Sequence, residues 1–370
     1  MARPSFAAGC DSLAKRFLTN DVFEGMASAR TARGVTVADV VRPGETHGSG
    51  VLAGDAECYS TFAALLDPVA EACVPGLQSG SRQARDLDPA HLNATKLGGA
   101  ADGVAVSTRL RLVRNFEFAG AGGAGEGALL AGMSAAERVE VEAATTKALE
   151  SLSGSGGGYY TSFADAGAAD GARASLGRKG LGGDEAPSDA ADPAGRGVFC
   201  TQDGNLAVWA NCGSEQLQIV SARPDGDVGA AFGLLARAAS QLEQAGRFRF
   251  DGHLGFVASE PALLGLGLTA SVTVKTPLTA GREGEAFAGM LADKGLSISK
   301  DVDAGEGAYT VSCTHRYGIS EVECVQKLHD GVALLVESEQ QQREAQSKAA
   351  ADADATEAKT DEAKAEAKED

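Results

Sequence analysis

Residues 104–114 read VAVSTRLRLVR, and their pattern characterises the larger part of the chain. Apolar and polar side chains alternate along this stretch, which is typical of a β-strand. On such a strand Arg109 and Arg111 lie on the same face, two residues apart. Strand-like runs recur further along the chain, at 197–199, 206–210, 217–221, 254–258, 270–275 and 309–312. We therefore predict a β-sheet in the region that follows residue 100.

Helical patterns lie between these runs. Residues 134–152 open with a capping box, in which Ser134 and Glu137 satisfy each other's backbone amides. Residues 227–244 form a long amphipathic stretch, and residues 321–339 form the last one. Strands clustered with intervening helices indicate an α+β domain, with the sheet covered on one side.

The first 95 residues have a helical pattern instead. Leu13, Phe17 and Leu18 fall on one face of a helix, and residues 58–69 repeat large apolar side chains at the same spacing. We expect a small helical domain here, separate from the sheet.

Glycine and alanine, 48 and 69 residues, make up 117 of the 370 residues. Much of the glycine lies in 120–127 and 154–195, where large apolar residues are few, so we predict flexible loops without a core of their own. The second loop is a Gly/Ala-rich insert in the larger domain. Residues 345–370 are rich in Ala, Lys, Glu and Asp. This composition predicts a disordered acidic tail with transient helix, and a solvated single helix with Glu-to-Lys pairs is the alternative.

The net charge of −18 disfavours binding to nucleic acids or to anionic lipid surfaces. No apolar run is long enough to span a membrane, and the first twenty residues do not resemble a secretory signal. Seven scattered cysteines without a C-x-x-C pair indicate reduced thiols and an intracellular protein. With five isolated histidines, we expect neither a metal site nor a resident cofactor.

Several segments together resemble the phosphagen (guanidino) kinase family, with arginine kinase as the nearest type. They include SGV at 49–51, DAECYSTFAALLDPV at 55–69, TRLRLVRN at 108–115, ASVTVKTP at 270–277 and YGISE at 317–321. The resemblance spans about residues 10 to 340. It implies a small all-helical domain at 1–95 and a larger domain at 100–340, with an antiparallel sheet flanked by helices (the guanidino kinase or glutamine synthetase-like fold). The activity it implies is reversible transfer of the ATP γ-phosphoryl group to a guanidino nitrogen.

Members of this family hold the phosphates with five arginines and magnesium. The resemblance places two of these arginines at Arg109 and Arg111, the residual nucleotide-binding residues. The third and fourth positions are Gln218 and Thr269, and the loop at 296–307 is too short to carry the fifth. Glutamine and threonine can donate hydrogen bonds but cannot offset the charge of a triphosphate.

The guanidino side has changed as well. The family's substrate loop corresponds to Ser49, Gly50 and Val51, while Glu260 stands where the family has a cysteine. A carboxylate at 260 can still pair with a guanidinium. The resemblance places the first catalytic glutamate near Cys212 and Gly213, with Glu215 close by in sequence. For the second catalytic glutamate, the only candidates are Asp303 and Glu306. The histidine that the family has before its adenine pocket is Cys200 here.

We therefore expect a catalytically inactive phosphagen-kinase-like protein that is a structural or accessory subunit of a larger assembly, with no catalytic residues. Two alternatives stay open: an active, divergent kinase that uses Glu260 to anchor the guanidinium and Mg-ATP as co-substrate, and a nucleotide- or guanidino-binding sensor without turnover. The expected partners are protein subunits of an axonemal or mitochondrial complex. The expected location is cytoplasmic or flagellar, with a mitochondrial location as a further alternative.

Overall fold

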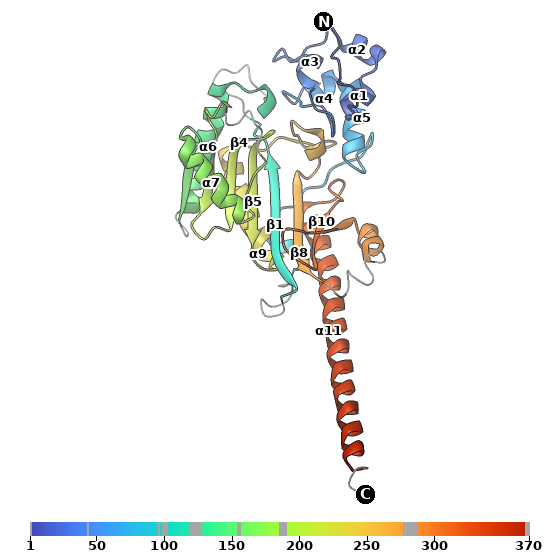
Figure 1. The fold of residues 1–370 in the computed structure, drawn as a ribbon. Helices are drawn as coiled ribbons and strands as arrows, with labels where there is room; N and C mark the ends of the chain where they lie inside the picture. Colours follow the sequence, from blue (N-terminus) through green and yellow to red (C-terminus); the bar gives the residue numbers. More distant parts are fainter. Residues whose placement is uncertain are drawn as a thin grey trace.

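The computed structural model describes residues 2–42, 44–94, 97, 103–117, 127–153, 157–184, 191–276, 278 and 287–366. Its centre is an eight-stranded sheet in the order β2-β3-β4-β5-β1-β8-β10-β9, in which every neighbouring pair is antiparallel (Figure 1). The strands are β1 (Ala105–Arg114), β2 (Gly158–Ser162), β3 (Gly197–Thr201), β4 (Leu206–Cys212), β5 (Glu215–Arg223), β8 (Leu268–Lys275), β9 (Leu296–Lys300) and β10 (Ala308–Cys313). The expected antiparallel sheet is confirmed. The run predicted at 254–258 instead contributes only β7 (Gly255–Phe256), which pairs with β6 (Phe250–Asp251) outside the main sheet.

One face of the sheet is covered by three long helices, α6 (Ala135–Ser153), α9 (Val228–Ala245) and α11 (Glu321–Glu366) (Figure 1). Leu110 and Leu112 of β1 are fully buried beneath them, in one large apolar cluster. The predicted capping box of α6 is present, with Ser134 N donating to Glu137 Oε2 at 2.8 Å and Glu137 N donating to Ser134 Oγ at 3.3 Å.

The opposite face is covered in part by α7 (Ala166–Arg178), and this corrects the prediction for 154–195. The described part of that insert contains β2, which pairs with β3, and α7, so it is not a flexible loop. Three large side chains, Phe163, Leu176 and Leu181, pack with Trp209 of β4 in a second apolar cluster. The small residues let the chain approach closely: a Cβ on Gly183 would lie 2.9 Å from the Trp209 ring. Few large residues are needed where backbone itself lies on the sheet.

For the C-terminal stretch the structure has the alternative form, a helix, rather than the preferred disordered tail. Residues 345–366 continue α11, which runs without a break from Glu321 to Glu366 and projects beyond the rest of the molecule (Figure 1). The first turns of α11 pack on the sheet, and this packing removes the cost of starting the helix. Residues 367–370 lie outside the described residues.

The N-terminal domain is helical, as expected. Its helices are α1 (Leu13–Phe17), α2 (Asn20–Met26), α3 (Val37–Val40), α4 (Cys58–Thr61) and α5 (Ala63–Cys73). They enclose a separate apolar cluster that also takes in residues of the larger domain, among them Val257 and Leu264. Two hydrogen bonds join the domains here: Ala53 N donates to Ser259 O at 2.7 Å, and the side-chain Tyr59 Oη donates to Ala258 O at 2.8 Å. Short 3-10 turns occur at Pro89–His91, Leu130–Gly132 and Pro261–Leu263.

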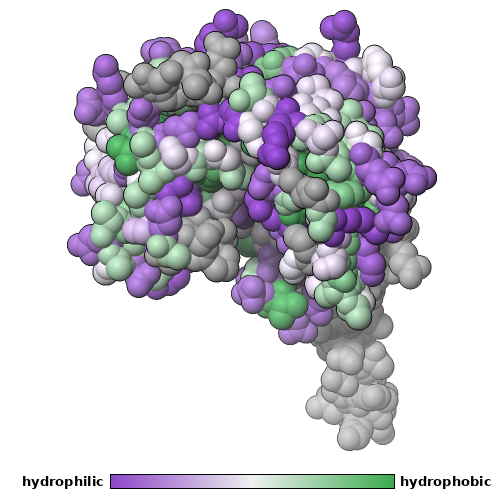
Figure 2. Space-filling view, turned by 90° about the horizontal axis from the view of Figure 1, so that it is seen from above, coloured by the Kyte–Doolittle hydropathy of each residue, from purple (hydrophilic) through white to green (hydrophobic). Residues whose placement is uncertain are grey.

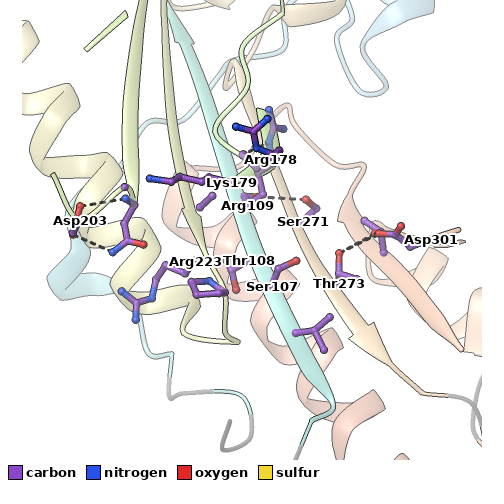
Figure 3. Close-up of a pocket in the computed structure, with 17 residues that line it drawn as sticks. Ser107, Thr108, Arg109, Arg178, Lys179, Asp203, Arg223, Ser271, Thr273 and Asp301 are labelled. Atoms are coloured by element: carbon purple, nitrogen blue, oxygen red, sulfur yellow. Dashed lines mark hydrogen bonds between the residues drawn. The ribbon is translucent and has the colours of Figure 1, made fainter. Parts of the chain in front are cut away.

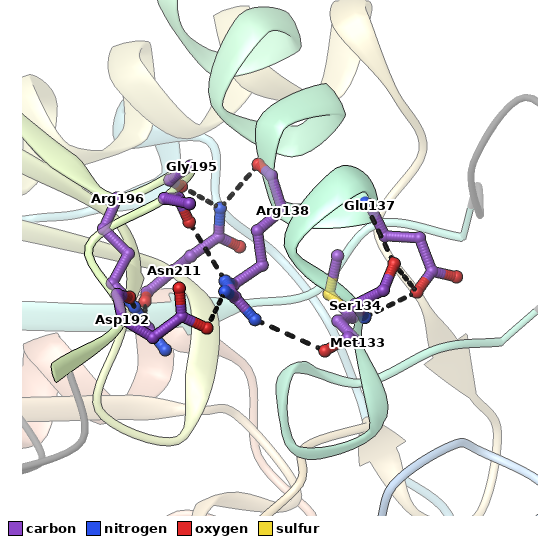
Figure 4. A network of polar contacts seen from close by, with 9 residues as sticks. Met133, Ser134, Glu137, Arg138, Asp192, Gly195, Arg196 and Asn211 are labelled. Atoms are coloured by element: carbon purple, nitrogen blue, oxygen red, sulfur yellow. Dashed lines mark hydrogen bonds and ion pairs between the residues drawn. The ribbon is translucent and has the colours of Figure 1, made fainter. Parts of the chain in front are cut away.

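A polar network joins the start of α6 to the end of β4 (Figure 4). Asn211 Nδ2 donates to Arg138 O at 2.9 Å and to Gly195 O at 2.6 Å, and Arg138 forms an ion pair with Asp192. Asn211 has a φ of +54°, which asparagine tolerates better than most residues. This network fixes the β4–β5 hairpin, which carries the candidate site residues 212–218.

The surface mixes polar and apolar residues. Seen from above, hydrophilic and hydrophobic residues are interspersed over this face (Figure 2). The large apolar side chains that are exposed lie in separate elements: Val139, Tyr159, Val302 and Leu334.

Candidate functional site

Arg109 and Arg111 lie on the same face of β1, as the alternation predicts, opposite Leu110 and Leu112. The structure shows that neither points into open solvent. Arg109 Nε donates to Gly180 O at 2.9 Å, and a terminal Arg109 nitrogen donates to Gly182 O at 2.8 Å. The chain that follows α7 thus lies across this arginine and accepts its hydrogen bonds.

Arg111 is held by the same segment. Its Nε donates to Gln218 Oε1 at 3.1 Å, and its terminal nitrogen forms an ion pair with Asp184. Gln218 also binds the backbone of Asp184 on both sides, accepting from Asp184 N at 2.8 Å and donating to Asp184 O at 2.7 Å. Burial lowers the pKa of Arg111, and the charge of Asp184 opposes this shift. We call residues 180–184 the covering segment.

Two carboxylates lie beside Arg111. Glu215 is buried and accepts hydrogen bonds from Asn115 Nδ2 at 2.6 Å, Ser259 N at 3.0 Å and Glu260 N at 3.1 Å. Burial raises the pKa of Glu215 to about 7, although these donors lower it. Glu260 is half-buried; burial raises its pKa, and the neighbouring charge of Glu45 adds to the effect.

The residues predicted for the substrate loop are engaged within the N-terminal domain. Ser49 O accepts from Ala14 N at 2.9 Å, and Val51 is fully buried in the domain's core. Gly50 has a φ of +65°, and a Cβ at this position would lie 2.8 Å from Ser12 Oγ. Only a glycine fits there. Glu45, which precedes this loop, lies close enough to Glu260 for its charge to raise the pKa of that carboxyl.

Of the other predicted positions, Thr269 lies at the candidate site, whereas Cys200, Asp303 and Glu306 lie elsewhere. Thr269 of β8 lies directly opposite Arg111 in the sheet, whereas Cys200 is buried in β3 under α7. Asp303 and Glu306 are exposed in the β9–β10 turn. Because β10 starts opposite the far end of β8, this turn lies about 20 Å along the strands from Thr269, at about 3.3 Å per residue. Neither acid is therefore close to Thr269 or to its neighbour Arg111.

A cavity of about 700 Å³ lies next to Arg109 on the sheet face (Figure 3). Arg178 and Lys179, at the end of α7, gather with Arg109 at one end of it, and Arg223 lies further along. Arg223 is paired with Asp225, at 2.9 Å between Nη2 and Oδ2. The cavity is thus lined by several cations beside hydroxyl and carboxylate groups.

Sequence reasoning missed two groups of residues. The first is the covering segment, in which Asp184 gave no motif. The second is the pair Arg114–Glu321, which is buried at both ends, with Arg114 Nη2 2.6 Å from Glu321 Oε1. The signal for this pair was present: the alternation that puts Arg109 on one face puts Arg114 on the face of Leu110 and Leu112, where a charge requires a partner.

No group of three or more His, Cys, Asp or Glu side chains among the described residues is placed to hold a metal ion. No helix in the described part of the chain has the length and apolar character needed to cross a membrane.

Comparison with known families identifies both domains. Residues 140–342 match the model of the ATP:guanido phosphotransferase C-terminal catalytic domain, and residues 8–71 match that of the ATP:guanido phosphotransferase N-terminal domain.

Individual relatives agree with these matches. An arginine kinase of Anthopleura japonica is 32% identical over 347 residues, and a flagellar creatine kinase of Strongylocentrotus purpuratus is 30% identical over 347 residues. The alignments cover 89% and 87% of this chain but only 46% and 28% of those relatives, so the chain spans less than half of their length. The crystal structure of a lombricine kinase matches with a TM-score of 0.76 at 24% identity, covering 90% of this chain and 93% of that one.

Proposed function

The chain belongs to the ATP:guanido phosphotransferase family, and we propose that it is a member that has lost phosphoryl transfer and serves as a structural or accessory subunit of a larger protein assembly. The observation that carries this proposal is the covering segment. Both arginines that correspond to the phosphate-binding arginines of the family donate their hydrogen bonds to residues 180–184 and Gln218.

The energetic argument concerns the charge that builds up on the transferred phosphoryl group. Phosphoryl transfer depends on positioning and on cations that stabilise this charge. Loss of a single electrostatic donor typically costs about 3 kcal/mol of transition-state stabilisation. Here Gln218 and Thr269 are uncharged, and Arg111 already faces Asp184. A Mg-ATP substrate would have to compete with the covering segment for Arg109 and Arg111, so these two arginines are poorly placed to act as a phosphate cage.

A turnover assay tests the loss of activity. Purified protein with ATP, magnesium and arginine should release no more ADP and form no more phosphoarginine than a blank. Creatine, lombricine and taurocyamine should be assayed as well, because relatives named for them share the fold or the family. Turnover that disappears in Arg109→Ala but persists in Arg16→Ala, an exposed arginine of the N-terminal domain, would overturn the proposal in favour of an active, divergent kinase.

The proposed partners are protein subunits, and an axonemal complex is the first place to look, because one relative is a flagellar creatine kinase. A mitochondrial complex is the alternative. Affinity purification of the tagged protein from its own cells should recover other subunits in fixed stoichiometry. A protein that elutes alone at the size of a single chain would contradict the structural role.

A second candidate function is a nucleotide sensor without turnover, and the cavity beside Arg109 favours it. Its volume of about 700 Å³ and its lining by Arg178, Lys179 and Arg223 suit an anionic ligand. Calorimetric titration with ADP separates the two functions. A purely structural subunit gives no heat, whereas a sensor gives saturable heat that falls in Arg178→Ala/Lys179→Ala and is unchanged in Arg16→Ala.

A further inference from the structure

We propose that Cys313 and Cys324 form a site of reversible thiol oxidation, at which a hydroperoxide converts the two thiols into a disulfide that joins β10 to α11. Cys313 is the last residue of β10, and Cys324 lies in the first turn of α11. Their sulfur atoms are 2.9 Å apart. A disulfide bond is about 2.05 Å long, so the sulfurs need to approach by only about 0.9 Å.

The contact between Cys313 and Cys324 joins two sulfur atoms, unlike the thiol contacts of Cys10, Cys58 and Cys200. All seven cysteines are free thiols in the structure. The thiols of Cys10, Cys58 and Cys200 contact oxygen atoms, at 3.2 Å to Ser12 Oγ, 3.2 Å to Asp55 Oδ1 and 3.3 Å to Thr201 O. Cys324 Sγ donates to Cys313 Sγ, on two elements that pack together directly, and Cys313 Sγ also contacts His315 O at 3.3 Å.

The two sulfurs are set up for different roles. The hydrogen bond from Cys324 lowers the pKa of Cys313, and the positive charges of Lys327 and Arg316 act in the same direction. The same contact raises the pKa of Cys324. Cys313 is 5% exposed and Cys324 is fully buried, so an oxidant reaches Cys313 first. Cys313 is therefore the attacking thiolate and Cys324 the resolving thiol.

The reaction balances in two steps. The Cys313 thiolate attacks one peroxide oxygen, the O–O bond breaks, and the leaving oxygen takes a proton, which gives a sulfenic acid on Cys313. The Cys324 sulfur then attacks the Cys313 sulfur, the S–O bond breaks, and the hydroxyl leaves as water with the Cys324 proton. With hydrogen peroxide the products are one disulfide and two waters. The thiols lose two electrons and the peroxide gains them.

The bond would close a segment that already connects three parts of the fold. Between the cysteines, Tyr317 Oη donates to His253 O at 2.6 Å and contacts Ser81 Oγ at 2.9 Å, and Glu321 forms the buried ion pair with Arg114. A cross-link across this segment restricts the unfolded chain and leaves the folded contacts in place. Oxidation should therefore raise the unfolding temperature.

Peptide mapping of the full chain tests the proposal. The protein is treated with hydrogen peroxide, remaining thiols are alkylated under denaturing conditions, and trypsin is added without reductant. Cleavage after Lys300, Arg316 and Lys327 places the two cysteines on separate peptides, 301–316 and 317–327, neither of which contains another cysteine. The expected result is a single species that joins these peptides and separates on reduction, together with loss of two of the seven titratable thiols.

Variants and unfolding curves provide the controls. Cys73→Ser should retain the cross-link and the rise in unfolding temperature, and Cys324→Ala should lose both. Recovery of peptides 301–316 and 317–327 as separate alkylated species after peroxide treatment overturns the proposal, whichever other residues are oxidised. A cross-link from Cys313 to any cysteine other than Cys324 also overturns it. Because the mapping uses the unmodified protein, it decides the matter even if Cys324→Ala does not fold.

Discussion

The two faces of the central sheet differ in what holds them together. On the face covered by α6, α9 and α11, Leu110 and Leu112 of β1 are packed in a continuous apolar cluster. On the other face of the same strand, Arg109 and Arg111 are held by hydrogen bonds to a segment of backbone and by one carboxylate. One ten-residue strand therefore carries apolar packing on one side and a network of hydrogen bonds and an ion pair on the other.

This difference indicates on which face of the sheet a substitution costs less folding stability. Apolar packing on the face covered by α6, α9 and α11 contributes most of the stability, because it removes large apolar side chains from water. The polar face contributes through hydrogen bonds whose net value is about 1 kcal/mol each. Gln218 and Thr269 lie on the second face beside Arg111, where we expect a substitution to cost less folding stability than one in the apolar cluster.

The largest expected effect comes from removing packing. Leu112→Ala should lower the free energy of unfolding by about 2–5 kcal/mol, because it leaves a cavity in the main core. Arg111→Ala, the neighbouring residue on the other face, should lower it by only about 1 kcal/mol. Urea denaturation of both variants measures the contrast. Equal losses would show that the two faces do not differ as described.

The next effect depends on pH. The folded-state pKa of Glu215, about 7, lies above its ordinary value of 4.5, so the folded protein binds more protons between these values. Stability from this group is fully present below about pH 4.5 and is lost as the pH rises through 7. The difference corresponds to on the order of 3 kcal/mol. Urea denaturation from pH 5 to 8 should show this decline in the unmodified protein and a flatter profile in Glu215→Gln.

The control for this pH profile is Glu150→Gln, which changes an exposed carboxylate of α6. It should follow the unmodified protein. If Glu215→Gln and the unmodified protein give parallel curves, Glu215 is charged throughout the range and its three donors outweigh its burial.

The smallest expected effect concerns the covering segment. The Asp184 side chain is 63% exposed, so its ion pair with Arg111 is worth less than about 1 kcal/mol. Asp184→Ala should therefore leave the unfolding free energy almost unchanged. Gln218→Ala removes bonds to both backbone groups of Asp184 and should speed hydrogen exchange at the Asp184 amide much more than Asp184→Ala does. Similar exchange in the two variants would show that the carboxylate, not the glutamine, holds the segment.

Much of the fold could be predicted from local pattern. Strict alternation identified β1, and capping residues together with apolar spacing identified α6 and α9. The same reasoning failed for α7, whose Gly/Ala-rich sequence carries little periodicity and whose position depends on Trp209, more than thirty residues away. For residues 345–366 it favoured disorder over a single helix, because helix formation there depends on the packed turns that precede them.

The candidate site was predicted in part. The shared face of Arg109 and Arg111 followed from the two-residue spacing. Their partners did not, because Gly180 and Gly182 contribute only carbonyl oxygens and carry no side-chain signal. The burial of Glu215 depends on Asn115 and on the loop at 259–260, which are distant in sequence and meet only in the folded chain.

Helix α11 has a mechanical consequence. Its 46 residues correspond to a rod of about 69 Å, at about 1.5 Å per residue. Glu339 is fully buried, and the 27 residues that follow, to Glu366, extend the rod by about 40 Å. A flexible linker of that length would let an attached group sample every direction, whereas a rod fixes both the distance and the bearing. A molecule bound near the end of the helix would therefore move with it, and a small change of tilt at Glu339 would produce a large displacement at Glu366.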